Sequence, residues 1–175
     1  AIAIEAARVL QKSMVLSDVS IREGVRSASW PGRFEVLGTD PLFVVDGAHN
    51  PQGVSALVES MDDLLEEAYS HKRIGIFGVL ADKGYQEMVE IIAPHLDGVI
   101  CYEPDNPRAL EADSLMHEFE KSAANKKAAE LMAALSPEEA VKAALDMTSP
   151  EDFVIAFGTL YSIAQIKSAY RSLCG

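Results

Sequence analysis

Along most of this sequence, short runs of apolar residues alternate with longer stretches in which apolar residues recur every three or four positions. The short runs are rich in valine, isoleucine and phenylalanine and predict β-strands, whereas the periodic stretches predict helices with one buried face. The predicted strands are residues 34–38, 42–46, 73–79, 98–102 and 152–157. The predicted helices are residues 1–13, 18–27, 51–66, 85–96, 111–122, 136–147 and 160–173.

This alternation predicts the fold class. Strands that alternate with helices and carry continuous runs of valine and isoleucine are typical of a mostly parallel sheet with helices on both faces. We therefore expect a three-layer α/β fold. Residues 123–135 leave two alternatives open, because their alanine, leucine and methionine favour helix while the alternation allows a short strand before Ser136.

Two of the predicted helices carry start signals. Asn50 is a favourable N-cap and is followed by Pro51 in the first turn. Ser136 and Glu139 have the spacing of a capping box. No such signal and no initiator methionine precedes residues 1–13, so we expect the chain to open inside a helix, as a piece of a longer protein would.

Composition narrows the classes of function. Hydrophobic residues make up 49% of the 175 residues, and the net charge of −12 disfavours nucleic acid and anionic membrane surfaces as partners. No stretch approaches the roughly 20 apolar residues of a membrane span. Cys101 and Cys174 suggest no disulfide framework, which favours a reducing cytoplasm. The histidines lie far apart, and we expect no metal held by this chain alone.

Three predicted strands are each followed by a short polar loop and then by a predicted helix. The strand and loop sequences are LFVVD-GAH, IGIFG-VLADKG and FVIAF-GT. The carboxyl ends of parallel strands lie at one edge of a sheet, where ligands bind in α/β proteins. The pattern therefore predicts that Asp46, His49, Lys83 and Thr159 approach one site. A carboxylate at position 46 would accept hydrogen bonds from sugar hydroxyls, and the helix terminus that follows would attract an anion.

Each of these residues also has a purely structural interpretation. Asp46 would cap a local turn, and His49 would bond to the backbone of its own loop. Lys83 would be solvated, and Thr159 would cap the last helix. The pattern alone leaves both interpretations open.

The segment WPGRFEVLGTDPLFVVDGAHNPQG, residues 30–53, resembles the signature of folylpolyglutamate synthase/dihydrofolate synthase in the Mur ligase superfamily. Further similar motifs are GVLADK at residues 78–83, NPRA at 106–109 and FGTLY at 157–161. They occur in the order of that family and at similar distances. Neither GxxxxGK[ST] nor GxGxxG occurs in the chain.

The resemblance implies an ATP-dependent ligase that adds L-glutamate to a folate carboxylate through an acyl phosphate, with or without dihydrofolate synthase activity. It implies a Rossmann-like C-terminal domain of the Mur ligase type at residues 33–175. A linker at residues 17–32 and the tail of a preceding domain's last helix at residues 1–16 would come before it. The partners would be an N-terminal P-loop ATPase domain, ATP, L-glutamate and folate or dihydropteroate. Magnesium is implied with its ligands outside this chain, and the chain alone is expected to be inactive.

The resemblance also assigns roles by position. Arg33 resembles the arginine that reaches the phosphates of ATP, and Asp46 resembles the aspartate on the ATP ribose. His49 and Lys83 resemble catalytic positions near the incoming glutamate and the γ-phosphate, and Thr159 would bind the glutamate, although many relatives have serine there. Arg108 lies in the NPRA motif, but a surface ion pair is the expected explanation for it.

Two alternatives stand beside this interpretation. The chain would be the C-terminal domain of a Mur-type ligase that adds amino acids to a cell-wall precursor, or a non-catalytic Rossmann-like binding module. Arg33 and Asp46 are both present, as a working enzyme would require, and this favours a ligase over a binding module.

Overall fold

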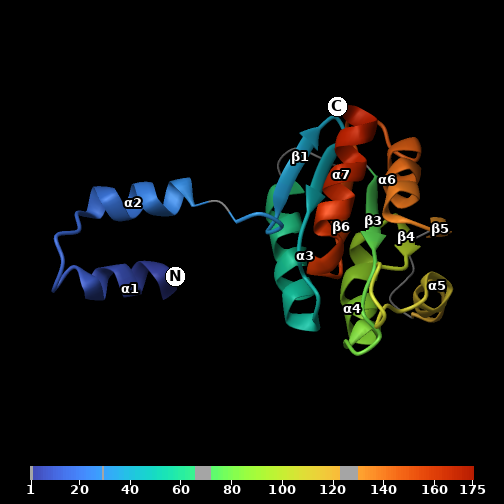
Figure 1. Ribbon diagram of the computed structural model, residues 1–175, viewed down its shortest axis with the longest axis horizontal. Coiled ribbons are helices and arrows are strands. Elements are labelled where there is room, and N and C mark those ends of the chain that lie inside the picture. Colours follow the sequence, from blue (N-terminus) through green and yellow to red (C-terminus); the bar gives the residue numbers. More distant parts are fainter. Residues whose placement is uncertain (1, 29, 66–71, 123–129) are drawn as a thin grey trace. The chain divides into compact units, whose positions relative to one another are not determined.

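The computed structural model describes residues 2–28, 30–65, 72–122 and 130–175 (Figure 1). Internal contacts divide the chain into two compact units, Ala1–Pro31 and Gly32–Gly175, which we name the helical unit and the α/β unit. The helical unit holds α1 (Ile2–Leu10) and α2 (Asp18–Ser27). Neither helix contains a buried residue, and the Ser17 hydroxyl caps α2 by accepting a hydrogen bond from the backbone of Ser20.

The α/β unit contains the remaining elements. Its strands are β1 (Glu35–Thr39), β2 (Leu42–Val45), β3 (Arg73–Phe77), β4 (Gly98–Tyr102), β5 (Glu130–Ala134) and β6 (Phe153–Phe157). Its α-helices are α3 (Pro51–Leu65), α4 (Tyr85–Ile92), α5 (Ala112–Lys121), α6 (Pro137–Asp146) and α7 (Ile163–Cys174), with short 3₁₀ helices at Ala93–His95 and Leu160–Ser162.

These strands form one six-stranded sheet in the order β1-β2-β6-β3-β4-β5. Among the strands that the structure describes, only β1 and β2 pair in antiparallel fashion, and all other neighbours are parallel. The last strand along the chain therefore lies between β2 and β3. This order brings the loops that follow β2, β6 and β3 next to one another, although they are far apart in the sequence.

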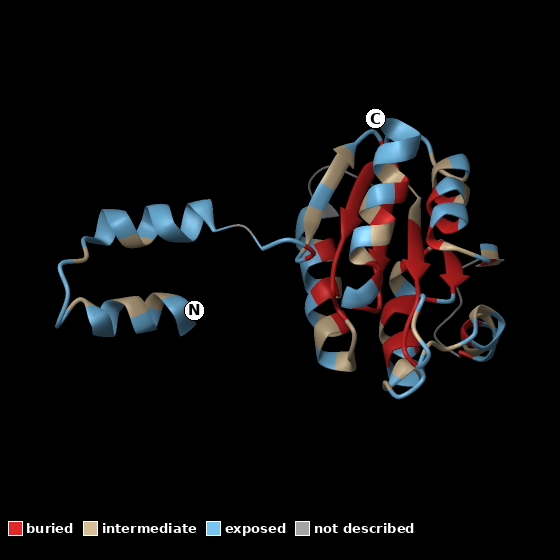
Figure 2. Cartoon of the chain, in the orientation of Figure 1, coloured by how far each residue is buried: buried red, intermediate tan, exposed pale blue. Residues whose placement is uncertain are grey.

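Helices cover both faces of the sheet, so the fold is the expected three-layer α/β arrangement (Figures 1 and 2). On one face, buried residues of α3, α4 and α5 pack against the sheet; they include Val54, Leu57, Met61, Met88, Val89, Ile92, Leu115 and Phe119. On the other face, α6 and α7 contribute Ala140, Val141, Ala144, Ile166 and Ala169. The central strands β2, β4 and β6 are buried along their whole length, as continuous apolar runs predict for a sheet covered on both faces.

For residues 123–135, where the sequence allows either a helix or a short strand, the structure decides only part of the question. Glu130–Ala134 forms β5 and pairs in parallel with β4, while residues 123–129 of that segment lie outside the described residues. Three predicted helices are shorter than expected. The helix predicted at residues 1–13 ends at Leu10. The helix predicted at 85–96 ends at Ile92 and passes into a 3₁₀ turn at Pro94, which lacks a backbone N–H, and the last helix begins as a 3₁₀ turn at Leu160–Ser162.

The helix start signals act largely as predicted. The Asn50 side chain accepts a hydrogen bond from the N–H of Gly53 at 2.7 Å, and the Ser136 hydroxyl accepts one from the N–H of Glu139 at 3.1 Å. The carboxylate of Glu139, however, accepts from the N–H of Leu135 at 2.8 Å, one residue before the position that a capping box uses. No helix in the described part of the chain has the length and apolar character needed to cross a membrane.

Candidate functional site

The loops after β2, β6 and β3 meet at the carboxyl edge of the sheet. The N–H of Gly158, after β6, donates to the carbonyl of Ala48, after β2, at 2.8 Å. On the side of β6 that faces β3, the N–H of Gly78, after β3, donates to the carbonyl of Phe157 at 3.3 Å. These bonds join the three loops that carry the residues singled out in the sequence.

A cavity of about 320 Å³ opens at this edge, and we name it the edge cavity. It is lined by His49, Leu80, Lys83, Arg108, Gly158, Thr159, Leu160 and Tyr161. Three predicted site residues, His49, Lys83 and Thr159, are therefore brought together. Asp46 and Arg33 are not among the lining residues.

His49 is held by the loop that carries it. Its Nδ1 lies 2.7 Å from the carbonyl oxygen of Gly47. Because a carbonyl oxygen only accepts, Nδ1 must carry the proton, so the neutral ring has an unprotonated Nε2. The expected backbone bond is present, and it leaves the second ring nitrogen available as a proton acceptor.

Thr159 is buried, with 3% of its surface exposed, yet it lines the edge cavity. Its hydroxyl oxygen accepts a hydrogen bond from the N–H of Tyr161 at 3.2 Å and so caps the 3₁₀ helix Leu160–Ser162. An N–H to oxygen bond uses only a lone pair, so the hydroxyl proton is still free to be donated. Thr159 therefore caps the 3₁₀ helix that precedes the last helix, whereas the N-cap of α7 itself is Ser162, and this capping role is compatible with ligand binding.

Positive charge gathers in the edge cavity. The ammonium of Lys83 makes no hydrogen bond or ion pair with any residue that the structure describes, and its side chain is only partly exposed. Arg108 adds a guanidinium on the same lining. In a chain with a net charge of −12, this local excess of cations makes the cavity a place where carboxylates or phosphates would bind.

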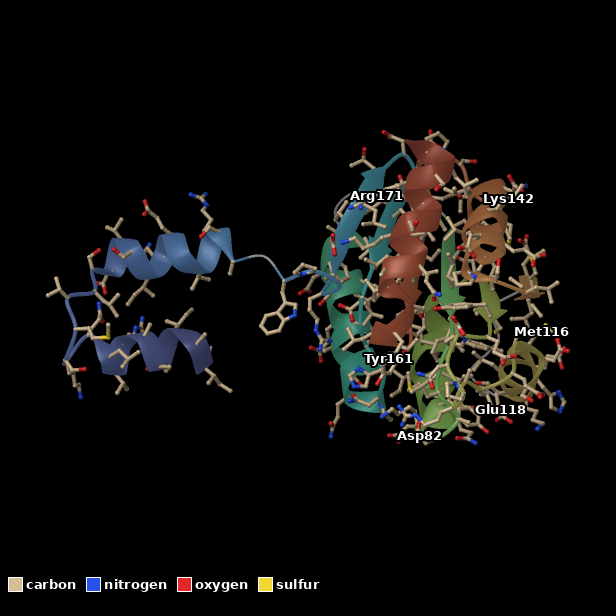
Figure 3. All side chains as sticks on the ribbon, in the orientation of Figure 1. Asp82, Met116, Glu118, Lys142, Tyr161 and Arg171 are labelled. Atoms are coloured by element: carbon tan, nitrogen blue, oxygen red, sulfur yellow. The ribbon has the colours of Figure 1, made fainter. Side chains whose placement is uncertain are left out.

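Arg108 reaches the cavity because two loops are joined. The N–H of Ala81 donates to the carbonyl of Arg108 at 2.8 Å, and Leu80 and Ala109 form an isolated antiparallel bridge. The expected ion pair is also present, with Asp82 2.9 Å from the guanidinium and both side chains about half exposed. Asp82 and Tyr161 lie toward the same end of the α/β unit in Figure 3. That Arg108 also lines the cavity was not predicted from the sequence.

Asp46 follows β2 directly but does not project freely into the crevice. Only 9% of its surface is exposed. One carboxylate oxygen accepts from the N–H of Ala48 and the other from the N–H of Phe34, each at 2.7 Å. Each oxygen keeps one further lone pair. Asp46 therefore joins its own loop to the loop that carries Arg33.

Glycine is required where these loops pass closest. Gly158 has φ +111°, and a Cβ there would lie 2.2 Å from the carbonyl oxygen of Gly78. A Cβ at Gly47 would lie 2.1 Å from a methyl group of Leu160. Because Leu160 is 50% exposed, its side chain could move aside, so this close approach does not by itself require glycine at position 47.

Other cavities are less suited to an anion. Two hollows of about 620 and 260 Å³ near the ends of β4 and β5 share Glu103 and Leu135 in their lining. Asp105 lines the larger one, and Glu111 and Asp113 line the smaller one. This negative charge would repel carboxylates.

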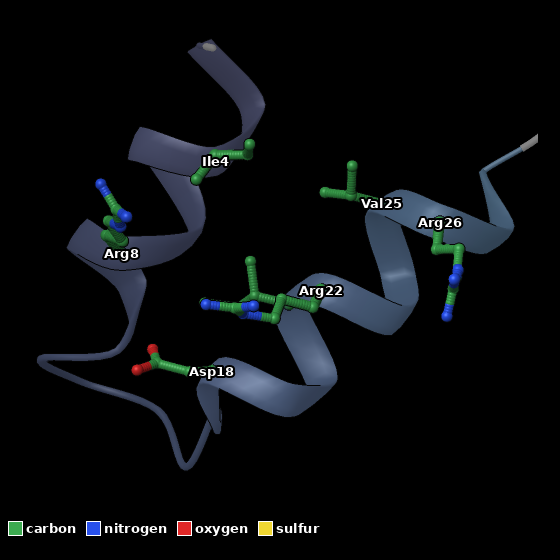
Figure 4. A pocket seen from close by; sticks show the side chains of 7 residues that line it. Ile4, Arg8, Asp18, Arg22, Val25 and Arg26 are labelled. Atoms are coloured by element: carbon green, nitrogen blue, oxygen red, sulfur yellow. The ribbon is translucent and has the colours of Figure 1, made fainter.

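The helical unit has a separate cavity of about 420 Å³ between α1 and α2 (Figure 4). It is lined by Ile4, Arg8, Asp18, Ile21, Arg22, Val25 and Arg26. None of the motifs that carry the family resemblance contributes to it. Across the described residues, no cluster of three or more histidine, cysteine, aspartate or glutamate side chains is placed to hold a metal ion.

Comparison with known proteins agrees with the motifs. A protein family described as "Mur ligase, glutamate ligase domain" matches residues 32–160. A probable bifunctional folylpolyglutamate synthase/dihydropteroate synthase of Halobacterium salinarum is 33% identical over 166 residues, which are 94% of this chain and 19% of that protein. The dihydrofolate synthase/folylpolyglutamate synthase of Bacillus subtilis is 32% identical over 174 residues, 98% of this chain and 38% of that protein. The chain therefore spans well under half the length of these relatives.

Solved structures show the same fold. The bifunctional folylpolyglutamate synthase/dihydrofolate synthase of Yersinia pestis, complexed with AMPPNP and Mn, matches with a TM-score of 0.81 and 27% identity. The match covers 95% of this chain and 38% of that one. Another bifunctional folylpolyglutamate synthase/dihydrofolate synthase, with Mn, AMPPNP and L-glutamate bound, matches with a TM-score of 0.79, 28% identity and the same coverage.

Proposed function

Because this chain belongs to the Mur ligase family through its glutamate ligase domain, we propose that it is the C-terminal domain of an ATP-dependent folylpolyglutamate synthase. In this proposal the whole enzyme adds L-glutamate to a folate carboxylate. The edge cavity binds the incoming glutamate, and the loop that carries Arg33 contributes to the ATP site. The observation that carries the proposal is the gathering of His49, Lys83, Arg108 and Thr159 around one cavity.

The chemistry of the lining suits a dicarboxylic amino acid. Glutamate carries two carboxylates, and the cavity offers the ammonium of Lys83 together with the guanidinium of Arg108, which already pairs with Asp82 through Nη1 and would use its remaining N–H groups. A guanidinium can bind a carboxylate through two parallel N–H donors. The Thr159 hydroxyl supplies a further donor, since its own backbone bond uses only a lone pair.

The proposed reaction proceeds in two steps. ATP first transfers its γ-phosphoryl group to the folate carboxylate, giving an acyl phosphate and ADP. The amine of glutamate then attacks the acyl carbon, the bond from that carbon to the phosphate oxygen breaks, and phosphate leaves as the amide forms. In this proposal the Nε2 of His49, which is unprotonated in the neutral ring, accepts the proton that the attacking amine loses. Lys83 offsets negative charge on the departing phosphate.

ATP would be shared with the remainder of the enzyme. Arg33 is exposed, and its guanidinium makes no bond to any described residue, so it is available to phosphate oxygens. Asp46 would accept from ribose hydroxyls only with the lone pairs that its two backbone bonds leave free. Magnesium would have its ligands in the remainder of the enzyme, as the family resemblance implies.

The test is a substrate panel with the full-length protein. Incorporation of labelled L-glutamate is measured with ATP and, in turn, dihydropteroate, a reduced folate and a uridine-nucleotide muropeptide. We expect ATP-dependent incorporation into the folate, and the dihydropteroate assay shows whether dihydrofolate synthase activity is also present. Incorporation into the muropeptide alone would support a cell-wall ligase, and no incorporation into any acceptor would support a binding module.

A further inference from the structure

We propose that Glu35 and Lys167 act as positioning residues for Arg33, by clamping the loop that presents its guanidinium to the phosphates of the nucleotide. The inference rests on the proposed function, because the ligand of Arg33 belongs to it. Neither Glu35 nor Lys167 lines the edge cavity. Their effect on the reaction would therefore be indirect, through the conformation of residues 32–34.

The loop around Arg33 is held from both sides. The N–H of Gly32 donates to one carboxylate oxygen of Glu35 at 2.7 Å, and the carbonyl of Gly32 accepts from the N–H of Gly47 at 2.7 Å. On the other side of Arg33, the N–H of Phe34 donates to Asp46. The exposed arginine thus lies between two residues whose backbone groups are fixed by the framework.

The held conformation is one that the chain would not adopt readily by itself. Gly32 has φ +72° and Phe34 has φ +42°. A positive φ is unfavourable for a bulky residue such as phenylalanine, and such conformations persist only when surrounding contacts enforce them. The hydrogen bonds to Glu35 and Asp46 are the contacts that do so here.

Lys167 connects this loop to a rigid helix. Its ammonium, on α7, pairs with the second carboxylate oxygen of Glu35, and the two side chains are only 17% and 29% exposed. The hydrogen bond from Lys167, followed by the one from Gly32, lowers the pKa of Glu35, so the carboxylate is charged and accepts from both. Gly32 also packs on Ile163 of α7, since a Cβ added to it would lie 3.2 Å from that side chain. The helix that begins beside the edge cavity therefore also fixes the Arg33 loop.

The clamp predicts a specific pattern of effects. In Glu35→Gln a single amide oxygen replaces two carboxylate oxygens, so the N–H of Gly32 and the ammonium of Lys167 cannot both keep an acceptor, and the loop is freer to leave the strained conformation. Arg33 would then have to be ordered when the nucleotide binds, which lowers affinity for the nucleotide. Glutamate binding in the edge cavity would be affected less, because neither Gly32 nor Glu35 lines that cavity.

A double-mutant cycle in the full-length protein tests this. Affinity for AMPPNP is measured for the wild type, Arg33→Ala, Glu35→Gln and the double variant. We expect Glu35→Gln to weaken binding about tenfold, and to have less than about twofold effect when Arg33 is already alanine. Equal effects of Glu35→Gln in both backgrounds would overturn the proposal, as would an unchanged affinity in the single variant.

Matched variants distinguish a specific effect on Arg33 from a general loss of structure. Lys167→Arg keeps the charge and should retain affinity, whereas Lys167→Met should behave as Glu35→Gln does. Lys142→Gln breaks a comparable ion pair, Lys142–Asp146, in which both side chains are 64% exposed, and should change nothing. Weakened nucleotide binding in Lys142→Gln to the same extent would contradict a clamp specific to Arg33.

A second measurement does not depend on the nucleotide. Amide hydrogen exchange in this chain should become faster at Gly32 and Gly47 in Glu35→Gln, while the amides of β3 and β6 keep their rates. Unchanged exchange at Gly32 and Gly47 would overturn the clamp. A wild-type protein that binds no nucleotide would instead refute the proposed function, and the exchange rates would still decide whether the clamp exists.

Discussion

The side chains around the edge cavity combine a local bond with a second polar group. His49 donates from Nδ1 to its loop, and Thr159 caps a 3₁₀ turn through a lone pair. Each bond orients the side chain without using the atom that a ligand needs. A structural role and a binding role are therefore compatible at these positions, and fixing the rotamer in advance reduces the entropy that binding would otherwise lose.

Thr159 provides a sharp test at the residue scale. Thr159→Val keeps the shape but removes the hydroxyl, and we expect the KM for L-glutamate of the full-length enzyme to rise about tenfold or more, as the loss of a hydrogen bond to a charged ligand predicts. Thr159→Ser keeps the donor and serves as the control, with a KM within about twofold of wild type. Similar KM values in the valine and serine variants would show that the hydroxyl does not contact glutamate.

Glu35 predicts a pH dependence of stability. Its pKa is lowered in the folded chain from an ordinary value of 4.5, first by the bond from Lys167 and then by the bond from Gly32. A lowered pKa contributes stability that is present above the ordinary value and is lost as the pH falls through the folded value. Between about pH 5 and pH 3, wild type should therefore lose more stability in chemical denaturation than Glu35→Gln. Parallel stability curves for the two proteins over that range would contradict the assignment.

The sequence predicts some of these residues and not others. Spacing after apolar runs brought Asp46, His49, Lys83 and Thr159 to one edge because a parallel sheet places equivalent strand ends together. It could not show that Asp46 bonds to the N–H of Phe34 or that Arg108 enters the cavity. Both depend on contacts between loops that are distant in the chain, and residue periodicity carries no information about such contacts.

At the scale of elements, a buried hydrogen bond connects β4 to the 3₁₀ helix Leu160–Ser162, whose first two residues line the edge cavity. The hydroxyl of Tyr102 bonds to that of Ser162, and these residues are 2% and 1% exposed. Burial raises the pKa of Tyr102 to about 12, so it remains a neutral hydrogen-bonding group. The ring of Tyr102 also fills the space beside Gly78, where an added Cβ would lie 2.5 Å from it.

This bond gives a prediction for stability. Tyr102→Phe leaves the buried hydroxyl of Ser162 without that partner and should lower the free energy of unfolding by about 1–3 kcal/mol. Adding Ser162→Ala removes the unsatisfied hydroxyl, so the double variant should be at least as stable as Tyr102→Phe alone, as judged by urea denaturation. A double variant destabilised by the full sum of the two single effects would show that the hydroxyls are not coupled.

Predictions from periodicity were reliable for elements with a long apolar pattern and weaker at their ends. Helix α2 begins and ends where expected, whereas Pro94 shortens α4 through a missing N–H. The strand Glu130–Ala134 was one of two alternatives, because its residues favour helix by themselves. It forms a strand because it pairs with β4, and the local sequence does not show this long-range contact.

At the scale of the whole molecule, the fold class follows from the alternation of strands and helices, but the strand order does not. Insertion of β6 between β2 and β3 is what places Thr159 between His49 and Lys83. No local signal in the sequence states which strands are neighbours. The resulting cationic cavity, in a chain of net charge −12, is the feature that directs the proposal toward an anionic amino acid.

The proposal divides the reaction between domains. The chain matches only 38% of the length of its Bacillus subtilis relative and contains no phosphate-binding GxxxxGK[ST] motif. Ligation would require closure of this domain over an ATPase domain, which aligns the amine with the acyl phosphate and excludes water. We therefore predict that the 175-residue chain alone incorporates no labelled glutamate in the presence of ATP and folate. Measurable turnover by this chain would refute that division.

The most direct test of the glutamate site is steady-state kinetics of the full-length enzyme with Lys83→Met, with Lys142→Met as an exposed-lysine control. We predict a rise of about tenfold or more in the KM for L-glutamate, less than about twofold change in the KM for ATP, and wild-type behaviour of the control. An unchanged KM for L-glutamate in Lys83→Met would show that Lys83 does not bind the incoming glutamate.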